Sequence, residues 1–221
     1  MITEKIDFLV NMSDKQWGEY AFSRDPINTK ISPEARQEMI QKANLCGRDQ
    51  ALKIKGKYPN SSIKEIAEKM NLDIVYKDTN GTDAYIMFAC YNSPNKVTLF
   101  MGNVTLVEKF IKEKQLEEKL DNVDIESMLL SHEIFHHIEE NEKDIYTRTE
   151  TVNLWKIGWF KYNSKLLALG EIAAMAFARE LLDLSYNPYV FDTLMLYPHD
   201  IDKTDKLFDE IKKVTGGNLN E

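Results

Sequence analysis

The sequence predicts an α+β fold that is mostly helical, with a small three-stranded antiparallel sheet ahead of a helix rich in histidine and glutamate. Long segments after residue 32 repeat their apolar residues with the period of a helix. Three short runs with strand-like composition follow one another in the middle of the chain: 72–78, 83–92 and 96–102. Turn residues at 80–81 and 92–95 separate these runs, so we expect antiparallel hairpins.

The chain is expected to form one domain with a short arm at its N-terminus. Residues 1–31 show no sustained period, so we expect them to be irregular. Ser32 followed by Pro33 is typical of a helix start, and this helix could be interrupted near Gly47. Residues 32–221 are predicted to form a single domain with a C-terminal helical extension.

Further helices are expected on both sides of the predicted sheet. Ser61 or Ser62 can cap a helix that runs through about Met70. After the sheet, apolar residues at helical spacing predict helices in four segments: 104–119, 123–140, 166–184 and 203–214.

Composition and charge limit the classes of function. The formal net charge is −8, which repels phosphates, so we expect no direct binding to nucleic acid. We also expect no membrane association, because no segment reaches the roughly 18–20 apolar residues of a transmembrane helix and the N-terminus does not resemble a secretory signal. Cys46 and Cys90 lack CxxC spacing and are typical of reduced thiols in a cytoplasmic protein.

The segment SHEIFHHIEE, residues 131–140, holds three of the four histidines. The apolar stripe of this helix, continued in steps of three and four, reaches His132 and His136. Side chains four residues apart lie over each other on one helix face, so both imidazoles could bind one ion. Glu133 would then lie beside that ion. His137 is expected to point about 100° away round the helix, either at the surface or behind the site.

This motif, HExxH, has a spacing that suits hydrolysis. Zinc held by two imidazoles and one further ligand keeps an open position for water and lowers the pKa of that water to roughly 7. A carboxylate beside the water can accept its proton and pass it to a leaving amine. Glu133 is the candidate base for this reaction. Nitrogen and oxygen ligands also bind Mn²⁺ and Fe²⁺, so either ion could replace Zn²⁺.

A third metal ligand is expected from another helix. Glu140 lies about 12 Å along the helix from His132, too far for the two to share an ion. The apolar segment LLALGEIAAMAFARELLDL contains Glu171 as the single carboxylate of its first turns. A buried carboxylate is costly unless it is paired or binds a metal, so Glu171 is the candidate ligand. His199, or a tyrosine such as Tyr162, could stabilise an oxyanion, although a histidine near a turn is more often a surface residue.

The segment before this helix is rich in aromatic residues, especially over 155–162. Packing in the core beneath a loop is the expected role of these side chains. The alternative is an exposed wall of a substrate cleft or a surface for a partner.

The combination of HEIFHH with EIAAMAFARELL resembles the ImmA/IrrE-like metallopeptidases, whose pattern is HExxH followed by ExxA(N/D)xFAxxLL. The matching residues downstream are Glu171, Ala174, Phe177, Ala178, Leu181 and Leu182. The resemblance covers roughly residues 60 to 185. It implies a gluzincin-like domain with Glu171 as third ligand, and cleavage of a protein partner, in known cases a helix-turn-helix repressor. Met175 departs from the pattern, where the family usually has Asn or Asp.

The leading hypothesis is therefore a zinc-dependent peptidase that hydrolyses a protein or peptide substrate, with His132, His136 and Glu171 as ligands and Glu133 as base. One alternative is a non-hydrolytic, metal-containing regulatory or binding module on the same scaffold. Another is a purely structural histidine pair. A separation of more than about 8 Å between Glu171 and the imidazoles would favour this last alternative, since ligands lie near 2 Å from their ion.

Overall fold

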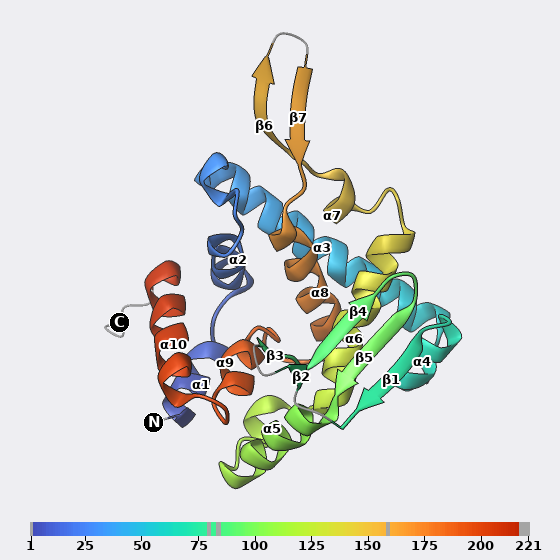
Figure 1. Cartoon of the computed structure of the whole chain (residues 1–221), viewed down its shortest axis with the longest axis vertical. Coiled ribbons are helices and arrows are strands. Elements are labelled where there is room, and N and C mark those ends of the chain that lie inside the picture. Colours follow the sequence, from blue (N-terminus) through green and yellow to red (C-terminus); the bar gives the residue numbers. More distant parts are fainter. Residues whose placement is uncertain (1, 79–80, 83–84, 158–159, 217–221) are drawn as a thin grey trace.

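A computed structural model describes residues 2–78, 81–82, 85–157 and 160–216. The chain is α+β and mostly helical, as predicted (Figure 1). The α-helices are α1 (Ile2–Val10), α2 (Asp14–Ser23), α3 (Pro33–Lys57), α4 (Ile63–Lys69), α5 (Met101–Glu113), α6 (Ile125–Asn141), α7 (Tyr146–Thr149), α8 (Leu167–Leu181), α9 (Val190–Leu196) and α10 (Ile201–Thr215). The strands are β1 (Asp73–Lys77), β2 (Gly81–Thr82), β3 (Tyr85–Ile86), β4 (Ala89–Asn92), β5 (Lys96–Phe100), β6 (Val152–Ile157) and β7 (Phe160–Ser164).

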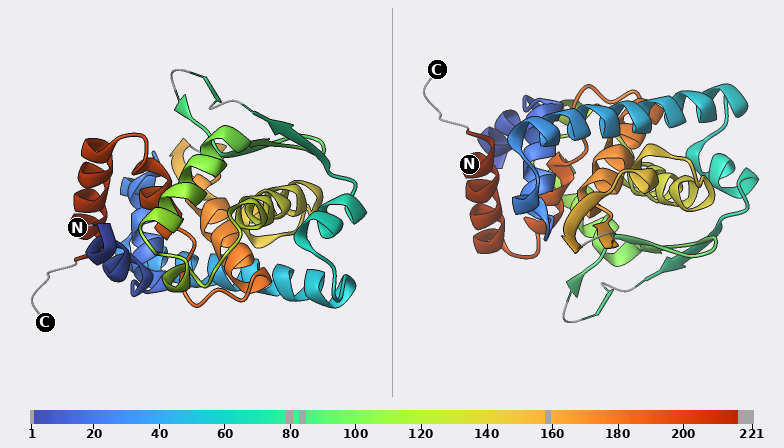
Figure 2. Two further views of the ribbon diagram at one scale, coloured as in Figure 1. Left: turned by 90° about the horizontal axis from the view of Figure 1, so that it is seen from below. Right: turned by 90° about the horizontal axis from the view of Figure 1, so that it is seen from above.

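Helix α6, which carries the HExxH motif, occupies the centre of the molecule. It packs against β4 and β5 and against α8, and α8 packs along α3. Figure 2 shows α6 nearly end-on, with the sheet on one side and α3 on the other. Phe135 of α6 and Phe177 of α8 are fully buried, with ring centroids 5.8 Å apart. The core therefore fixes the two helices that carry the predicted ligands.

Helix α3 is continuous through Gly47, where the sequence suggested an interruption. Ser32 accepts a hydrogen bond from the backbone of the first turn, as predicted for its cap. The glycine instead permits close packing: a Cβ on Gly47 would lie 2.1 Å from the carbonyl oxygen of Ala173 and 2.9 Å from the amide nitrogen of Phe177. Any side chain here would collide with the backbone of α8. Gly47 thus sets how closely α8 approaches α3.

The main sheet is mixed, so the prediction of three antiparallel strands is wrong in part. Its order is β1-β5-β4. Strand β4 pairs antiparallel with β5, as predicted, across the turn at Ser93-Pro94. Strand β1, however, pairs parallel with β5. A parallel pair needs a long connection, and here that connection includes the separate two-stranded β2–β3 ladder. This ladder begins at Gly81, the second residue of the predicted turn at 80–81, and Asn80 lies outside the described residues.

The prediction of an irregular N-terminal arm is also wrong. Helices α1 and α2 bury several large side chains, including Trp17 and Phe22, which are fully inaccessible. Ser13 and Gln16 form a capping box at the start of α2. These helices span only 9 and 10 residues, so neither shows enough turns to establish a period. The N-terminal segment is part of the core.

The aromatic segment forms an antiparallel hairpin, β6–β7, in place of the predicted loop. The strands pair from Val152 with Ser164 to Ile157 with Phe160, and Figure 1 shows the hairpin extending away from the helical body. Tyr162 is 54% exposed, which contradicts core packing for this residue. Trp159 lies outside the described residues.

Helices α4, α6, α8 and α10 agree with their predicted ranges to within three residues, whereas α5 begins three residues before its predicted range and ends at Glu113, six residues before the predicted end. Ser62 caps α4 through a capping box with Glu65. Helix α9 was not predicted. Within the described part of the chain, no helix is both long enough and apolar enough to cross a membrane.

Candidate metal centre

Helix α6 brings the two histidines of HExxH together. Asp124 starts the helix by accepting a hydrogen bond from the Ser127 amide at 2.9 Å. Buried Met128, Leu129 and Phe135 set the helical phase and place His132 and His136 one turn apart on a face that borders a hollow. Their Nε2 atoms lie 3.0 Å apart.

Glu171 reaches these imidazoles from the first turns of α8. His132 Nε2 lies 3.4 Å from Oε2 of Glu171, and His136 Nε2 lies 3.6 Å from Oε1. Within the described residues, His132, His136 and Glu171 form the group whose ligand atoms could hold one metal ion. Both separations are well below 8 Å, so the observation that would have favoured a purely structural histidine pair is not made.

The three separations fit a tetrahedral metal site. Ligand atoms bound at about 2.0–2.1 Å to a tetrahedral ion lie about 3.3 Å from one another. The two Nε2 atoms lie 3.0 Å apart, and each lies near a different oxygen of Glu171: Oε2 is 3.4 Å from His132 and Oε1 is 3.6 Å from His136. One ligand atom from each of the three residues lies within 4.8 Å of the other two. Two imidazoles and one carboxylate are also a common donor set for catalytic zinc. The residues present therefore fit a bound divalent ion.

The pKa values of His132 and Glu171 show how strongly these two groups interact. Burial disfavours the charged form of His132, but the hydrogen bond and charge of Glu171 outweigh it and raise the pKa of His132 to about 9. Burial likewise opposes ionisation of Glu171, yet the two histidines lower its pKa to about 2. The Glu171 side chain is 48% exposed, so its carboxylate remains accessible from the hollow.

Glu133 lies in the wall of that same hollow, which has a volume of about 590 Å³. The residue as a whole is only 8% exposed. Further walls come from β4, from α7 and from the chain leading into α8, including Tyr91, Arg148 and Leu167. The centre is thus open to a space large enough for several residues of a peptide, with a buried carboxylate beside the ligands.

A smaller hollow of about 260 Å³ adjoins the centre, since Glu171 and Leu167 line both spaces. Met175 lies here, at the position where the sequence pattern suggested Asn or Asp. Helices α2 and α9 supply polar groups: Arg24 Nη1 donates to the Tyr20 hydroxyl at 2.6 Å, and that hydroxyl donates to Asp192 at 2.9 Å. Burial raises the pKa of Asp192. Sequence reasoning missed these residues because it placed α2 in an irregular arm and did not predict α9.

Glu139 is a further residue that the sequence did not assign to the site. Its Oε2 lies 3.5 Å from Nδ1 of His136, the ring nitrogen other than the one that faces Glu171. Burial opposes ionisation of Glu139, but His136 and Thr147 lower its pKa. The spacing of three residues on one helix could have indicated this contact.

The other histidines and Tyr162 lie elsewhere. His137 Nδ1 is 3.1 Å from the Tyr91 hydroxyl, so it ties α6 to β4 behind the ligands. His199 packs edge-on against Phe88 and lines a separate hollow near α5 and α10. Tyr162 lies on the extended hairpin. The structure therefore does not bring His199 or Tyr162 into the group formed by the ligands and Glu133.

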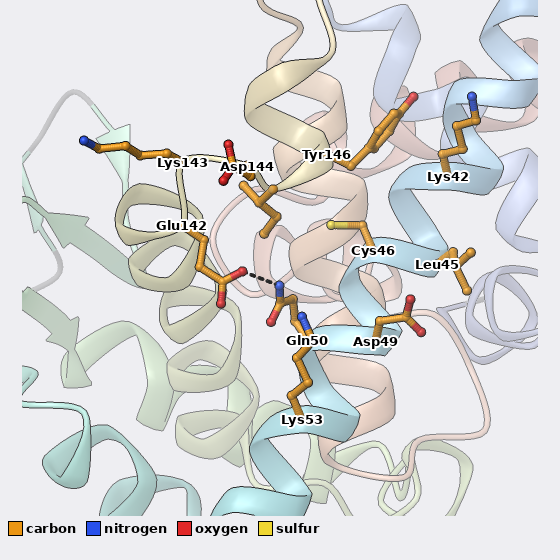
Figure 3. A pocket seen from close by; sticks show the side chains of 11 residues that line it. Lys42, Leu45, Cys46, Asp49, Gln50, Lys53, Glu142, Lys143, Asp144 and Tyr146 are labelled. Carbon is orange, nitrogen blue, oxygen red and sulfur yellow. Dashed lines mark hydrogen bonds between the residues drawn. The ribbon is translucent and has the colours of Figure 1, made fainter.

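Another hollow, of about 620 Å³, lies between α3 and the connection from α6 to α7 (Figure 3). It contains Cys46 and a hydrogen bond from Gln50 to Glu142 at 2.6 Å, and its lining includes none of the candidate ligands. Its volume is close to that of the hollow at the metal centre. Volume therefore does not single out the site, whereas the ligand geometry does.

No family model, curated protein or solved structure significantly matches this chain. The assignment of the site consequently depends on the geometry of its own residues.

Proposed function

We propose that this protein is a zinc-dependent peptidase with a gluzincin-like site. The observation that carries the proposal is the convergence of His132, His136 and Glu171: one ligand atom from each lies within 4.8 Å of the other two, and the nearest separations, 3.0 to 3.6 Å, are close to the roughly 3.3 Å expected around a tetrahedral ion. The opening of this group into a hollow beside Glu133 supports a catalytic role. The likeness of the two motifs to ImmA/IrrE-like metallopeptidases agrees with the same assignment.

His132, His136 and Glu171 would hold the ion, and Zn²⁺ suits this donor set, as Mn²⁺ or Fe²⁺ also could. When bound, zinc would supply a Lewis acid that polarises a carbonyl and makes nearby water more acidic. Glu133 would accept a proton from a water molecule as the oxygen of that water attacks the peptide carbonyl carbon. The same carboxyl would return that proton to the amine as the carbon–nitrogen bond breaks.

The walls of the hollow suggest how a peptide would lie. Among the described strands, β4 pairs only with β5, so its other edge has no partner strand there. Cys90 and Tyr91 of this strand line the hollow. An extended peptide can add to such an edge through backbone hydrogen bonds. We therefore propose an extended segment of a protein as substrate, which by family resemblance could belong to a helix-turn-helix repressor.

The free cysteines, Cys46 and Cys90, suit the cytoplasmic location that we propose. The alternative function is a metal-containing regulatory module that binds a partner without cutting it. Both functions use the same ligands, and they differ only in whether Glu133 performs chemistry.

The substitution Glu133→Gln tests catalysis separately from metal binding. The variant should still bind one zinc ion, because Glu133 is not a ligand, but it should cleave unfolded casein at least about 100-fold more slowly than the wild-type chain. Glu140→Gln is the matched control, since Glu140 lines the same hollow from an exposed position.

Equal cleavage by the Glu133→Gln and wild-type chains would refute the assigned base. A wild-type chain that binds zinc but cuts neither casein nor a mixed peptide library would favour the non-hydrolytic module.

A further inference from the structure

The two ring nitrogens of His136 face different carboxylates. Nε2 lies on the side of the metal centre, 3.0 Å from His132 Nε2 and 3.6 Å from Glu171. Nδ1 faces the opposite way, with Oε2 of Glu139 at 3.5 Å. A neutral imidazole carries a proton on one nitrogen, and binding a metal through Nε2 requires that proton to be on Nδ1. Glu139 lies where it can accept this proton's hydrogen bond.

Two neighbours hold Glu139 in this place. Arg148 donates to the backbone carbonyls of Glu139 and Glu140, which anchors the last turn of α6 to α7. On the other side, Gly170 of α8 leaves space for the carboxylate: a Cβ at this position would lie 3.1 and 3.2 Å from the two oxygens of Glu139. Gly170 directly precedes the candidate ligand Glu171. The helix that supplies the third ligand thus also accommodates the carboxylate behind the second.

We propose that Glu139 is a positioning residue, which holds the His136 ring with Nδ1 protonated and Nε2 directed at the metal. The proposal rests on the metal site proposed above. Ligating histidines commonly donate their other N–H to a carboxylate, and loss of such a partner typically weakens metal binding by about 10–100-fold. The separation of 3.5 Å would shorten as the ring becomes fixed by a metal, since such contacts often tighten on ligand binding.

Zinc affinity, measured by competition with a chelator, tests this role without any substrate. Glu139→Ala should weaken zinc binding by about 10–100-fold. Glu139→Gln should recover part of the loss, because its amide oxygen still accepts a hydrogen bond. Glu140→Ala is the control for charge: it removes a neighbouring carboxylate that lines the same hollow but bonds to Ser93 instead of His136. Its zinc affinity should stay close to that of the wild type.

The substitution Gly170→Ala tests whether displacing the Glu139 carboxylate weakens zinc binding without a loss of fold stability. Alanine favours a helix more than glycine does, so this variant should be no less stable than the wild type if Glu139 alone has to move. The displaced carboxylate should nevertheless weaken zinc binding in the direction seen for Glu139→Ala. Thermal unfolding of each chain without zinc shows whether a change in affinity reflects lost structure.

Nitrogen-15 NMR of the histidines gives a direct readout. In the zinc-loaded wild-type chain, His136 should show a protonated Nδ1 whose hydrogen exchanges slowly, and Glu139→Ala should speed that exchange. Equal zinc affinity in Glu139→Ala and Glu140→Ala, with unchanged exchange at Nδ1, would overturn the role of Glu139 while leaving the metal site intact. A wild-type chain that takes up no zinc would overturn both.

Discussion

Replacing Gly47 with alanine should disturb the metal centre from a distance. The new methyl group would lie 2.1 Å from the carbonyl oxygen of Ala173, whereas favourable contacts are near 3.5 Å or longer. Helix α8 would have to retreat from α3 by roughly 1 Å or more to relieve this overlap. Glu171 precedes Ala173 by two residues on α8, so the candidate third ligand would move with the helix.

The effect of Gly47→Ala on the free energy of unfolding can be estimated by comparison with Gly56, a second glycine of α3. Overpacking typically costs about 1–3 kcal/mol, and the higher helix propensity of alanine offsets up to about 1 kcal/mol. At Gly56 a new Cβ would meet nothing within 4 Å, so Gly56→Ala should stabilise the chain by about 0.5–1 kcal/mol. We expect Gly47→Ala to lower the free energy of unfolding by about 1–2 kcal/mol.

Chemical denaturation of both variants, together with zinc titration, measures these effects. Gly47→Ala should also bind zinc more weakly than the wild type, whereas Gly56→Ala should bind it equally well. If Gly47→Ala proved as stabilising as Gly56→Ala and kept its full zinc affinity, the close approach of α3 and α8 would not control the position of Glu171.

Because the pKa of His132 is raised to about 9, zinc must displace a proton at pH 7.5; calorimetry in buffers of different ionisation enthalpy should detect a release of about one proton, and zero release would contradict the pairing. Zinc affinity should therefore rise with pH up to about 9. His199→Ala and Tyr162→Phe should leave both zinc binding and casein cleavage near wild-type values, and a large loss of cleavage would restore either residue as a catalytic candidate. Trp17→Ala should lower the free energy of unfolding by about 3–5 kcal/mol, while an irregular arm would tolerate it.

The ligand-bearing helices could be predicted because their signals are local. Helix α6 repeats apolar residues over four turns, so its phase assigned His132 and His136 to one face before any tertiary contact was known. Glu171 was predictable for a related reason: an apolar helix containing a single early carboxylate implies a partner for it. The caps at Ser32 and Ser62 are equally local.

The errors arose where the outcome depends on residues far apart in the chain. Turn residues near Gly81 favoured a hairpin, but they do not determine that β1 pairs with β5 across an intervening ladder. Glycine at position 47 could equally mark a break in a helix or a contact between two helices, and only the position of Ala173 decides between them. Helix α2 is an exception, because Ser13 and Gln16, which form its capping box, are a local signal of a helix start.

The β6–β7 hairpin should tolerate changes in sequence and length better than the packed helices that carry the candidate ligands. It is inserted between α7 and α8, and residues that precede and follow it in the chain are among those that line the hollow at the candidate metal centre: Thr147, Arg148, Lys165 and Leu166. Its strands pair with each other and extend beyond the helical body (Figure 1). Insertions or deletions at the tip of such an element are tolerated more readily than changes in packed helices. If the proposed peptidase function holds, a change in the length of this hairpin should alter which substrates are cleaved and leave the candidate ligands on α6 and α8 in place.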